Sequence, residues 1–207
     1  MIKSLVVTLF LLITGLYAQS QILYSVKVSG GIATQQVASI GLISTKIINT
    51  FNFSGVVELP VKYGFWLESG LGIKNKGSEL EDNALTITTR LTYLQLPFDV
   101  VRKFTFTDIG IFYLGAGGYV ANGLWGSFDY QTPSSVSSDN VRFGNDNDFR
   151  RIDAGLNFIT GFELKNKLTF NIEYSLGLNN IASQTQKDTG TLNIKNRLFS
   201  LGLGYLF

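Results

Sequence analysis

Apolar and polar residues alternate with a period of two along most of the chain, which is typical of β-strands that have one face in an apolar environment. In residues 151–164, apolar side chains such as Leu156 and Phe158 occupy one face, and polar ones such as Asp153 and Asn157 occupy the other. Similar alternation, blurred by glycines in the range 108–121, predicts strands over further ranges: 24–33, 51–59, 65–74, 85–101, 108–121, 168–179 and 196–207. The pattern therefore predicts eight β-strands.

The apolar parity changes once, within residues 85–101. Leu85, Ile87 and Leu91 are out of phase with Leu94 and with the alternating apolar residues that follow it. One extra residue in a strand moves all later side chains to the opposite face. We therefore expect a long strand with a β-bulge in this range.

The connections between the predicted strands alternate between longer and shorter ones. In chain order they cover residues 34–50, 60–63, 77–84, 102–107, 122–149, 165–167 and 180–195. Up-and-down barrels of outer membranes have short turns at the periplasmic end and longer loops outside. In this rhythm both chain ends fall on the short-turn side. The fold class we expect is all-β, an eight-stranded antiparallel up-and-down transmembrane β-barrel with its termini in the periplasm.

Side-chain size indicates which face of each strand meets lipid. The apolar faces carry large Leu, Ile, Phe and Tyr residues, whereas the polar faces mix Gly, Ser, Asn and Thr with isolated charges. The interior of an eight-stranded barrel is just wide enough to be filled by side chains, so the smaller polar faces are expected inside. The alternative is a secreted, soluble, lipocalin-like ligand-binding barrel with its apolar faces inside. It would expose a Gly-rich surface poor in Lys and Glu, which is unusual in water.

Aromatic residues gather where the predicted strands meet the short turns. They are Tyr63, Phe65, Phe98, Phe104, Phe106, Phe162, Tyr205 and Phe207. Transmembrane barrels carry girdles of aromatic residues at the membrane interfaces. We expect these residues to form one such girdle, although aromatic residues also have a high strand propensity of their own.

Residues 1–18 have the layout of a secretory signal peptide. Lys3 precedes an apolar run over residues 5–16, and the small residue Ala18 precedes a polar change. The run is shorter than the roughly 20 apolar residues of a spanning helix, which argues against a retained anchor helix. We expect cleavage after Ala18, which leaves residues 19–207 as the outer-membrane β-barrel domain.

The composition excludes several classes of protein. Charged residues make up 15% of the 207 residues, against roughly 25% in an ordinary soluble domain. The chain has no Cys and no His, so disulfides, Cys-ligated zinc, iron–sulfur clusters and Ser-His-Asp triads are excluded. The formal charge is +2, and it falls to +1 without Lys3 (16 basic against 15 acidic residues). Without a dense Lys/Arg run, nothing indicates a nucleic-acid partner.

Parts of the sequence resemble a known family. They are residues 92–98 (TYLQLPF), 113–117 (YLGAG), 149–157 (FRRIDAGLN) and 196–207 (NRLFSLGLGYLF). On these stretches the chain resembles the PorT-like family of small outer-membrane β-barrel proteins, which is abundant in Bacteroidota. The resemblance implies a barrel in the outer membrane of a Gram-negative cell. Some relatives are implicated in protein secretion across that membrane, but no residue here carries that role over. The terminal Tyr205-Leu206-Phe207 is similar to the signal by which such barrels are handed to the insertion machinery.

Charged residues on the polar faces are the main candidates for chemistry. They are Lys27, Glu58, Glu68, Lys74, Arg151, Asp153, Glu163, Glu173 and Arg197. Charges in a low-dielectric interior need partners, so we expect a salt-bridge network that fills the lumen. Glu163 and Glu173 are a carboxylate pair of the kind used in acid–base catalysis, but a filled lumen gives a substrate no access. We expect no enzyme and no cofactor. A gated proton or ion path and a porin-like small-molecule transporter are the alternatives, although water-filled porins have about 16–18 strands.

The longest connection holds the remaining candidates. Residues 144–148 (GNDND) offer oxygen ligands for calcium, but they lack the full spacing of a calcium loop, and such runs commonly form Asx turns. We expect no metal there. The Ser-rich residues 130–140 are expected to be mobile. Phe128, Tyr130 and Phe143 are candidates for a surface that recognises a protein partner, because loops on rigid scaffolds carry binding. The expected function is structural or interactive: a membrane anchor displaying loops in adhesion, envelope integrity or as an accessory to secretion.

Overall fold

The computed structural model describes residues 22–39, 41–43, 45–82, 85–106, 109–183 and 192–207. Within these ranges, ten antiparallel strands form one sheet. They are β1 (Leu23–Ser39), β2 (Gly41–Ile43), β3 (Ile48–Pro60), β4 (Phe65–Asp82), β5 (Leu85–Phe106), β6 (Gly110–Thr132), β7 (Ser135–Asn140), β8 (Ile152–Leu164), β9 (Leu168–Gly177) and β10 (Asn193–Leu206). The signal peptide predicted for residues 1–18 lies outside the described residues. No helix in the described part of the chain is long and apolar enough to cross a membrane.

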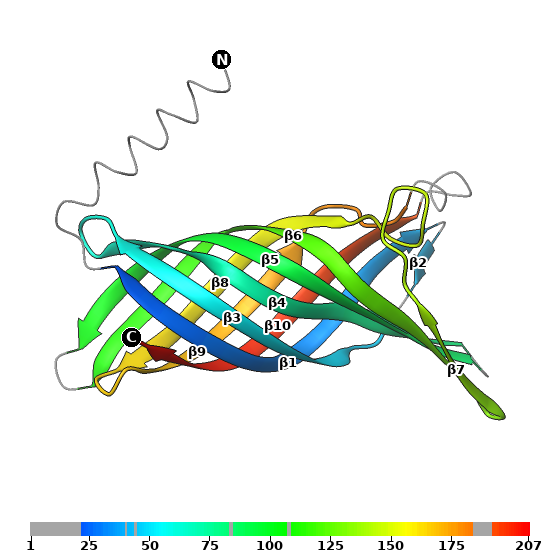
Figure 1. The fold of residues 1–207 in the computed structure, drawn as a ribbon, viewed down its shortest axis with the longest axis horizontal. Helices are drawn as coiled ribbons and strands as arrows, with labels where there is room; N and C mark the ends of the chain where they lie inside the picture. Colours follow the sequence, from blue (N-terminus) through cyan, green and yellow to red (C-terminus); the bar gives the residue numbers. More distant parts are fainter. Residues whose placement is uncertain (1–21, 40, 44, 83–84, 107–108, 184–191) are drawn as a thin grey trace, which may run out of the picture.

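Eight of the strands in the described ranges close into a ring. The ring follows chain order, β1-β3-β4-β5-β6-β8-β9-β10, and β10 pairs with β1 to close it. The short strands β2 and β7 pair with β1 and β6 and extend these strands beyond the ring. Figure 1 shows an elongated barrel with the short turns and the C-terminus at one end, and with β2 and β7 at the other. The predicted eight-stranded antiparallel up-and-down barrel is confirmed.

The strands continue further toward the long-loop end than the alternation predicts. β4 reaches Asp82, so most of the predicted connection 77–84 belongs to a strand. Likewise, β1 extends to Ser39 and β3 begins at Ile48, both inside the predicted connection 34–50. These strand ends are rich in polar residues and lack the apolar alternation that marks a lipid-facing strand. These ends are strands because they form backbone hydrogen bonds with a neighbouring strand, and the alternation of side chains gives no information about that pairing.

Two of the short turns lie where they are predicted, but the connection predicted over residues 102–107 does not, because β5 continues to Phe106. Residues 61–64 link β3 to β4, and residues 165–167 link β8 to β9. Tyr63 and Gly64 have φ angles of 56° and 77°, and Lys167 has a φ of 69°. Tight connections between antiparallel strands need such left-handed conformations because they match the twist of the strands.

The bulge predicted within residues 85–101 has the right position but the wrong strand. The pairing of β4 with β5 keeps one register throughout. The pairing of β5 with β6 shifts between Thr92 and Tyr93, where Leu124 of β6 is the extra residue. Leu91 is out of phase with the later apolar residues because it is fully buried inside the barrel, not because β5 is interrupted.

The two faces of the barrel wall sort as the side-chain sizes predict. Large apolar residues such as Phe158, Leu201 and Leu203 are exposed on the outside, whereas Asn157 and Ser175 are buried inside. The soluble lipocalin-like alternative needs the opposite arrangement and is excluded. An exposed apolar surface of this extent is rare on a soluble monomer and marks contact with a membrane or another protein.

The predicted girdle residues lie on or near the outer surface. Tyr63, Phe98 and Phe207 are well exposed. Phe162 is half-buried, because its ring stacks on Phe106 with centroids 6.4 Å apart and also contacts Phe112. Phe112 is not among the girdle residues predicted from the sequence, but this contact makes it part of the same aromatic cluster.

Candidate functional site

Lys103 of β5 contacts two carboxylates at the short-turn end of the lumen. Its Nζ forms ion pairs with Glu58 of β3 and Glu163 of β8, and all three side chains are at least nine-tenths buried. The same Nζ lies 4.5 Å from the ring centroid of Trp66. One ammonium shared by two carboxylates offsets the repulsion that would otherwise act between them. This cluster ties three strands together at the inner wall.

Lys27 and Lys74 pair with carboxylates in the middle of the lumen. Lys27 Nζ lies 3.0 Å from Glu68 Oε1, and Lys74 Nζ lies 2.6 Å from Glu173 Oε2. Lys27 belongs to β1 and Glu68 to β4, which are separated in the ring by β3; Lys74 belongs to β4 and Glu173 to β9, which lie further apart around the ring. Both ion pairs therefore join strands that are not neighbours in the ring, and they cross the lumen.

Lys76 and Asp153 form an ion pair near the long-loop end, and both side chains are completely buried. Lys76 Nζ lies 3.0 Å from Asp153 Oδ2 and 4.0 Å from the ring centroid of Tyr119. The same carboxylate oxygen accepts hydrogen bonds from the Tyr119 hydroxyl at 3.3 Å and from Asn196 Nδ2 at 3.0 Å. Donors and an aromatic face thus replace the water that both charges lose on burial.

The predicted salt-bridge network is confirmed for most of its members. The residues found buried and paired are Lys27, Glu58, Glu68, Lys74, Asp153, Glu163 and Glu173. The carboxylate pair considered for acid–base chemistry is not assembled: Glu163 pairs with Lys103, and Glu173 pairs with Lys74.

Arg151 and Arg197 do not face the lumen, so these two predictions are wrong. Arg151 precedes β8, is exposed, and donates to the Phe143 carbonyl at 3.3 Å. Arg197 shares the outward face of β10 with Phe199 and donates to Gln36 Oε1 at 2.7 Å. In the alternation along β10, Arg197 is in phase with the outward-facing apolar residues Phe199 and Leu201. The sequence pattern therefore indicates an outward position for Arg197, and the predicted lumen position disregards it.

Lys76, Lys103 and Asp99 are lumen charges that the sequence analysis missed. Lys76 follows the predicted strand 65–74 by two residues, and Lys103 lies in the predicted turn 102–107. In both cases the period-two alternation continues through the charged residue, so extending it would have placed both lysines inside. Their own polarity is what made these strand ends look like connections.

A small polar cavity lies in the middle of the lumen. Its volume is about 30 Å³, and its lining includes Gln95, Asp99 and Tyr113. Within the described part of the chain, the Gln95 amide, Asp99 Oδ1 and the Tyr113 hydroxyl have no hydrogen-bond partner. The cavity has room for about one or two water molecules. It is too small for a substrate.

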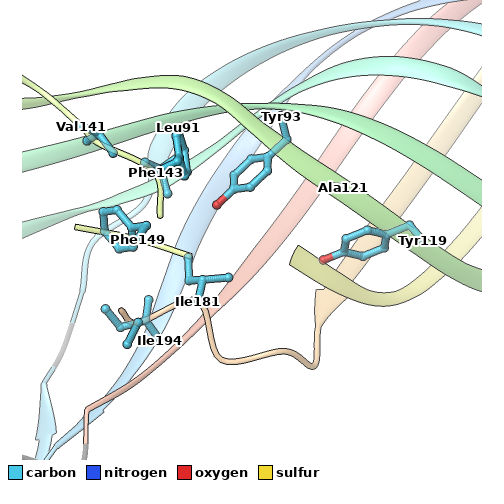
Figure 2. Packing of buried hydrophobic residues seen from close by; sticks show 10 residues of the cluster. Leu91, Tyr93, Tyr119, Ala121, Val141, Phe143, Phe149, Ile181 and Ile194 are labelled. Carbon is cyan, nitrogen blue, oxygen red and sulfur yellow. The ribbon is translucent and has the colours of Figure 1, made fainter. Parts of the chain in front are cut away.

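An apolar cap closes the lumen at the long-loop end (Figure 2). We define it as Leu91, Tyr93, Tyr119, Ala121, Val141, Phe143, Phe149, Ile181, Ala182 and Ile194. Val141, Phe143 and Phe149 come from the connection that leads into β8, and Ile181 comes from the connection between β9 and β10. These residues pack on inward-facing strand residues, as the Tyr93 and Phe143 rings do edge to face at 5.7 Å. Two loops are thus folded into the barrel mouth.

Backbone hydrogen bonds hold the cap in place. Arg150 N donates to Ile181 O at 2.8 Å, and Ile181 N donates to Ile194 O at 2.9 Å. Val141 N donates to Gly126 O at 2.9 Å. The loops therefore extend the hydrogen bonding of the wall, and the cap is a built part of the fold.

Phe143 is buried in the cap, so its assignment to an exposed recognition surface is wrong. Phe128 packs against the cap and contacts Phe149 with ring centroids 5.8 Å apart. Tyr130 lies further out, next to Phe128. Phe128 and Tyr130 both lie on the part of β6 that pairs with β7, and Tyr130 is the one further from the cap.

Residues 130–140 form a hairpin where the composition predicts a mobile loop. β7 pairs with the outer part of β6, from Ser127–Asn140 to Thr132–Ser135. Every residue of β7 is exposed, and the hairpin projects beyond the barrel in Figure 1. An ion pair between Arg90 and Asp129 supports its base.

Residues 144–148 use their polar side chains for the loop itself. Asp148 Oδ2 accepts a hydrogen bond from the Arg142 backbone N–H at 2.8 Å, and Asn147 Nδ2 donates to the Phe143 carbonyl at 3.4 Å. Across the described ranges, no group of three or more His, Cys, Asp or Glu residues is placed to hold a metal ion.

The fold and this lumen define a membrane β-barrel with buried charges and a lipid-facing outer wall. A family model described as the outer membrane protein beta-barrel domain matches residues 17–183. The chain therefore belongs to this outer-membrane β-barrel family, which supports a location in the outer membrane with its lipid bilayer as the surroundings. No curated protein matches the chain.

Solved structures of outer-membrane proteins are similar to this chain. Neisserial surface protein A is 10% identical, with 90% of this chain and 98% of that one covered and a TM-score of 0.45. The attachment invasion locus protein Ail of Yersinia pestis is 15% identical, with 88% and 98% covered and a TM-score of 0.40. A major outer membrane protein from Thermus thermophilus is 13% identical, with 90% and 100% covered and a TM-score of 0.46.

Proposed function

We propose that this protein is a non-conducting and non-enzymatic outer-membrane anchor that displays a surface for interaction at the extracellular end. The observation that carries the proposal is the closed lumen, in which buried ion pairs cross from wall to wall beneath the apolar cap. Breaking one buried pair costs about 3–5 kcal/mol when a charge is left without its partner. A solute would have to break several pairs and displace the cap.

The displayed surface is the β6–β7 hairpin. Its exposed strand β7 and Tyr130 stand on a barrel whose wall and cap are tied together by backbone hydrogen bonds. Binding residues are disproportionately found on connections that a rigid scaffold positions. The partner we propose is a protein, in adhesion, envelope integrity or as an accessory to a secretion complex.

Single-channel recording in planar bilayers tests the closed lumen. Purified protein, shown to be folded by its heat-modifiable mobility in gels, is expected to give no stable conductance step. A porin added to the same bilayer controls for detection. Stable unitary conductance of the folded protein would overturn the proposal, and uptake of sugars in a liposome-swelling assay would favour the transporter alternative.

Site-specific photo-crosslinking in native membranes tests the displayed surface. A photoreactive residue at Val136, which is 78% exposed on the hairpin, is expected to give a protein adduct of defined mass. The same residue at Leu201, on the lipid-facing wall, is the matched control and is expected to give no protein adduct. A hairpin position that yields no adduct while the barrel is inserted would contradict the interaction role.

We also propose the route by which the chain reaches the membrane. The sequence pattern supports a signal peptide over residues 1–18 and membership of the PorT-like branch in Bacteroidota. Tyr205 and Phe207 pack edge to face at 5.4 Å on the outer surface, where insertion machinery can reach the Tyr205-Leu206-Phe207 signal. The mass of protein isolated from the outer membrane tests cleavage after Ala18. Deleting Phe207 is expected to reduce insertion, whereas Phe65→Leu is the control that leaves the signal intact.

A further inference from the structure

β3 and β4 are paired over only part of their lengths. The ladder between them ends at the pair Phe53–Ile73. In the described part of the chain, the next backbone contact is the isolated bridge between Lys46 and Glu79, where Lys46 N donates to Glu79 O at 2.7 Å. Between these points β3 remains paired with β1, and β4 remains paired with β5. The wall therefore contains a seam, which we define as residues 47–52 against residues 74–78.

Asn75 holds the seam together through its backbone N–H and its side chain. Its backbone N–H donates to Asn52 Oδ1 at 2.9 Å, and its Nδ2 donates to the Phe51 carbonyl. Its Oδ1 accepts a hydrogen bond from the Thr92 hydroxyl at 2.8 Å. Single side-chain contacts thus replace a continuous backbone ladder at this point.

β4 turns inward at the seam. Gly77 has a φ of 146°, and a Cβ at this position would meet the Thr89 carbonyl and the Ile48 side chain. Beyond it, the Ser78 hydroxyl donates at 2.9 Å to Gln35 Oε1 of β1, which is not the ring neighbour of β4. This inward step leaves a depression on the outside of the wall.

The depression is a groove of about 430 Å³, within the roughly 300–1,000 Å³ typical of small-ligand sites. Phe51 and Trp125 give it an apolar part, and they are 65% and 59% exposed. Arg90, Asn75, Ser127 and Asn140 give it a polar part. The groove therefore suits an amphiphile better than a purely apolar or a purely polar ligand.

The polarity of the groove changes along the barrel axis. Phe51 lies two residues from Phe53, which belongs to the exposed apolar band of β3. Ser127 and Asn140 are paired at the base of the β6–β7 hairpin, which projects beyond the barrel. A lipid of the outer leaflet has the same gradient, because its chains point to the bilayer centre and its head group to the outside.

We propose that this groove binds one acyl chain of an outer-leaflet lipid, with the head group at the polar rim formed by Arg90, Ser127 and Asn140. The acyl chain lies against the exposed rings of Phe51 and Trp125. The groove reaches Lys76 of the lumen at its floor and shares Ser127 and Asn140 with the base of the hairpin, but it needs neither a conducting lumen nor the proposed protein partner.

Tryptophan fluorescence tests the groove directly. The chain has two tryptophans, and Trp66→Phe leaves Trp125 as the single reporter at the site. Phosphatidylglycerol with dibrominated chains is titrated into this folded protein in detergent, since bromine quenches a tryptophan that it contacts. We expect saturable quenching that reaches its plateau near one lipid per barrel.

Variants of the groove and of the neighbouring wall separate specific binding from general contact with lipid. Ser127→Phe, which fills the groove, is expected to weaken the saturable quenching at least tenfold. Asn122→Phe, exposed on β6 but outside the groove, is the matched control and is expected to retain it. Asn140→Phe, on the exposed hairpin, provides a second filling variant should Ser127→Phe fail to fold. Quenching that never saturates, or that both filling variants leave unchanged, overturns the proposal.

Discussion

Lys76 shows how a single residue depends on its surroundings in this lumen. The ammonium is fully buried, and its compensation is the Asp153 carboxylate together with the Tyr119 ring. An ion pair in this position contributes little net stability compared with apolar side chains of similar volume. Removing one partner, however, leaves the other charge buried without compensation, which is strongly destabilising. The consequence is a strong asymmetry between removing one charge and removing both.

Lys76→Met is expected to lower the free energy of unfolding by about 3–5 kcal/mol, because Asp153 stays buried without its cation. The double variant Lys76→Met/Asp153→Asn should recover a large part of that loss. Lys46→Met, which removes an exposed pair with Glu81, is the control and should cost below about 1 kcal/mol. Urea unfolding in lipid vesicles measures all three. Equal losses for Lys76→Met and Lys46→Met would contradict the buried pair.

Lys103 makes a related prediction because it serves two carboxylates. Lys103→Met leaves Glu58 and Glu163 both buried without a cation, whereas Lys27→Met leaves Glu68 alone. We therefore expect Lys103→Met to be the more destabilising of the two in the same unfolding assay. The reverse order would show that water, rather than Lys103, solvates the carboxylates at the short-turn end.

At the scale of strands, the alternation of side chains predicts most of what the structure shows, and it fails for identifiable reasons. It gives the ring strands and their lipid-facing sides, because a two-residue period is imposed by the wall itself. It misses the long-loop end of β4, where polar residues on both faces hide the period, and the short-turn end of β5, where the charged residues Arg102 and Lys103 resemble the start of a turn. It also misreads Leu91, because an inward apolar residue belongs to the cap, and the cap depends on loops distant in sequence.

The outward face of β10 gives a depth-dependent prediction. Leu201 lies in the middle of the strand, and Tyr205 lies near its end at the short turns. An arginine on the lipid face costs about 2–4 kcal/mol at the bilayer midplane and about 0–1 kcal/mol near the interface. Leu201→Arg should therefore be clearly more destabilising in vesicles than Tyr205→Arg. Equal costs at the two depths would argue against lipid on this face.

The β6–β7 hairpin and the cap are adjacent in the chain but separable in effect. Replacing residues 130–137 by a two-residue Asn-Gly turn keeps the pairing of Asp129 with Ser138 and should leave insertion and unfolding unchanged, because β7 is exposed throughout. Deleting residues 127–146 removes Val141 and Phe143 of the cap as well and should lower stability. Gel mobility and urea unfolding distinguish the two deletions, and a loss of insertion with the shorter one would make the hairpin structural.

The whole molecule combines a predictable wall with features that need the three-dimensional structure. Length, strand number and the rhythm of the connections predict the barrel, because closure of the ring follows from the same local pattern in each strand. The ion-pair partners, the cap and the seam between β3 and β4 could not be predicted, since they depend on which strands meet across the lumen and where one strand turns inward. Within the seam, Gly77 and Asn75 have no distinctive sequence signal.

Spin labelling tests the central claim, which is that bulky apolar side chains face lipid while the ion pairs fill the interior. The chain has no cysteine, so single labels can be attached to Leu203→Cys and Phe158→Cys without other changes. In reconstituted bilayers, both labels should collide readily with oxygen and poorly with a water-soluble nickel chelate. A stable monomer in detergent-free buffer, with both labels inaccessible to either reagent at its centre, would contradict the account.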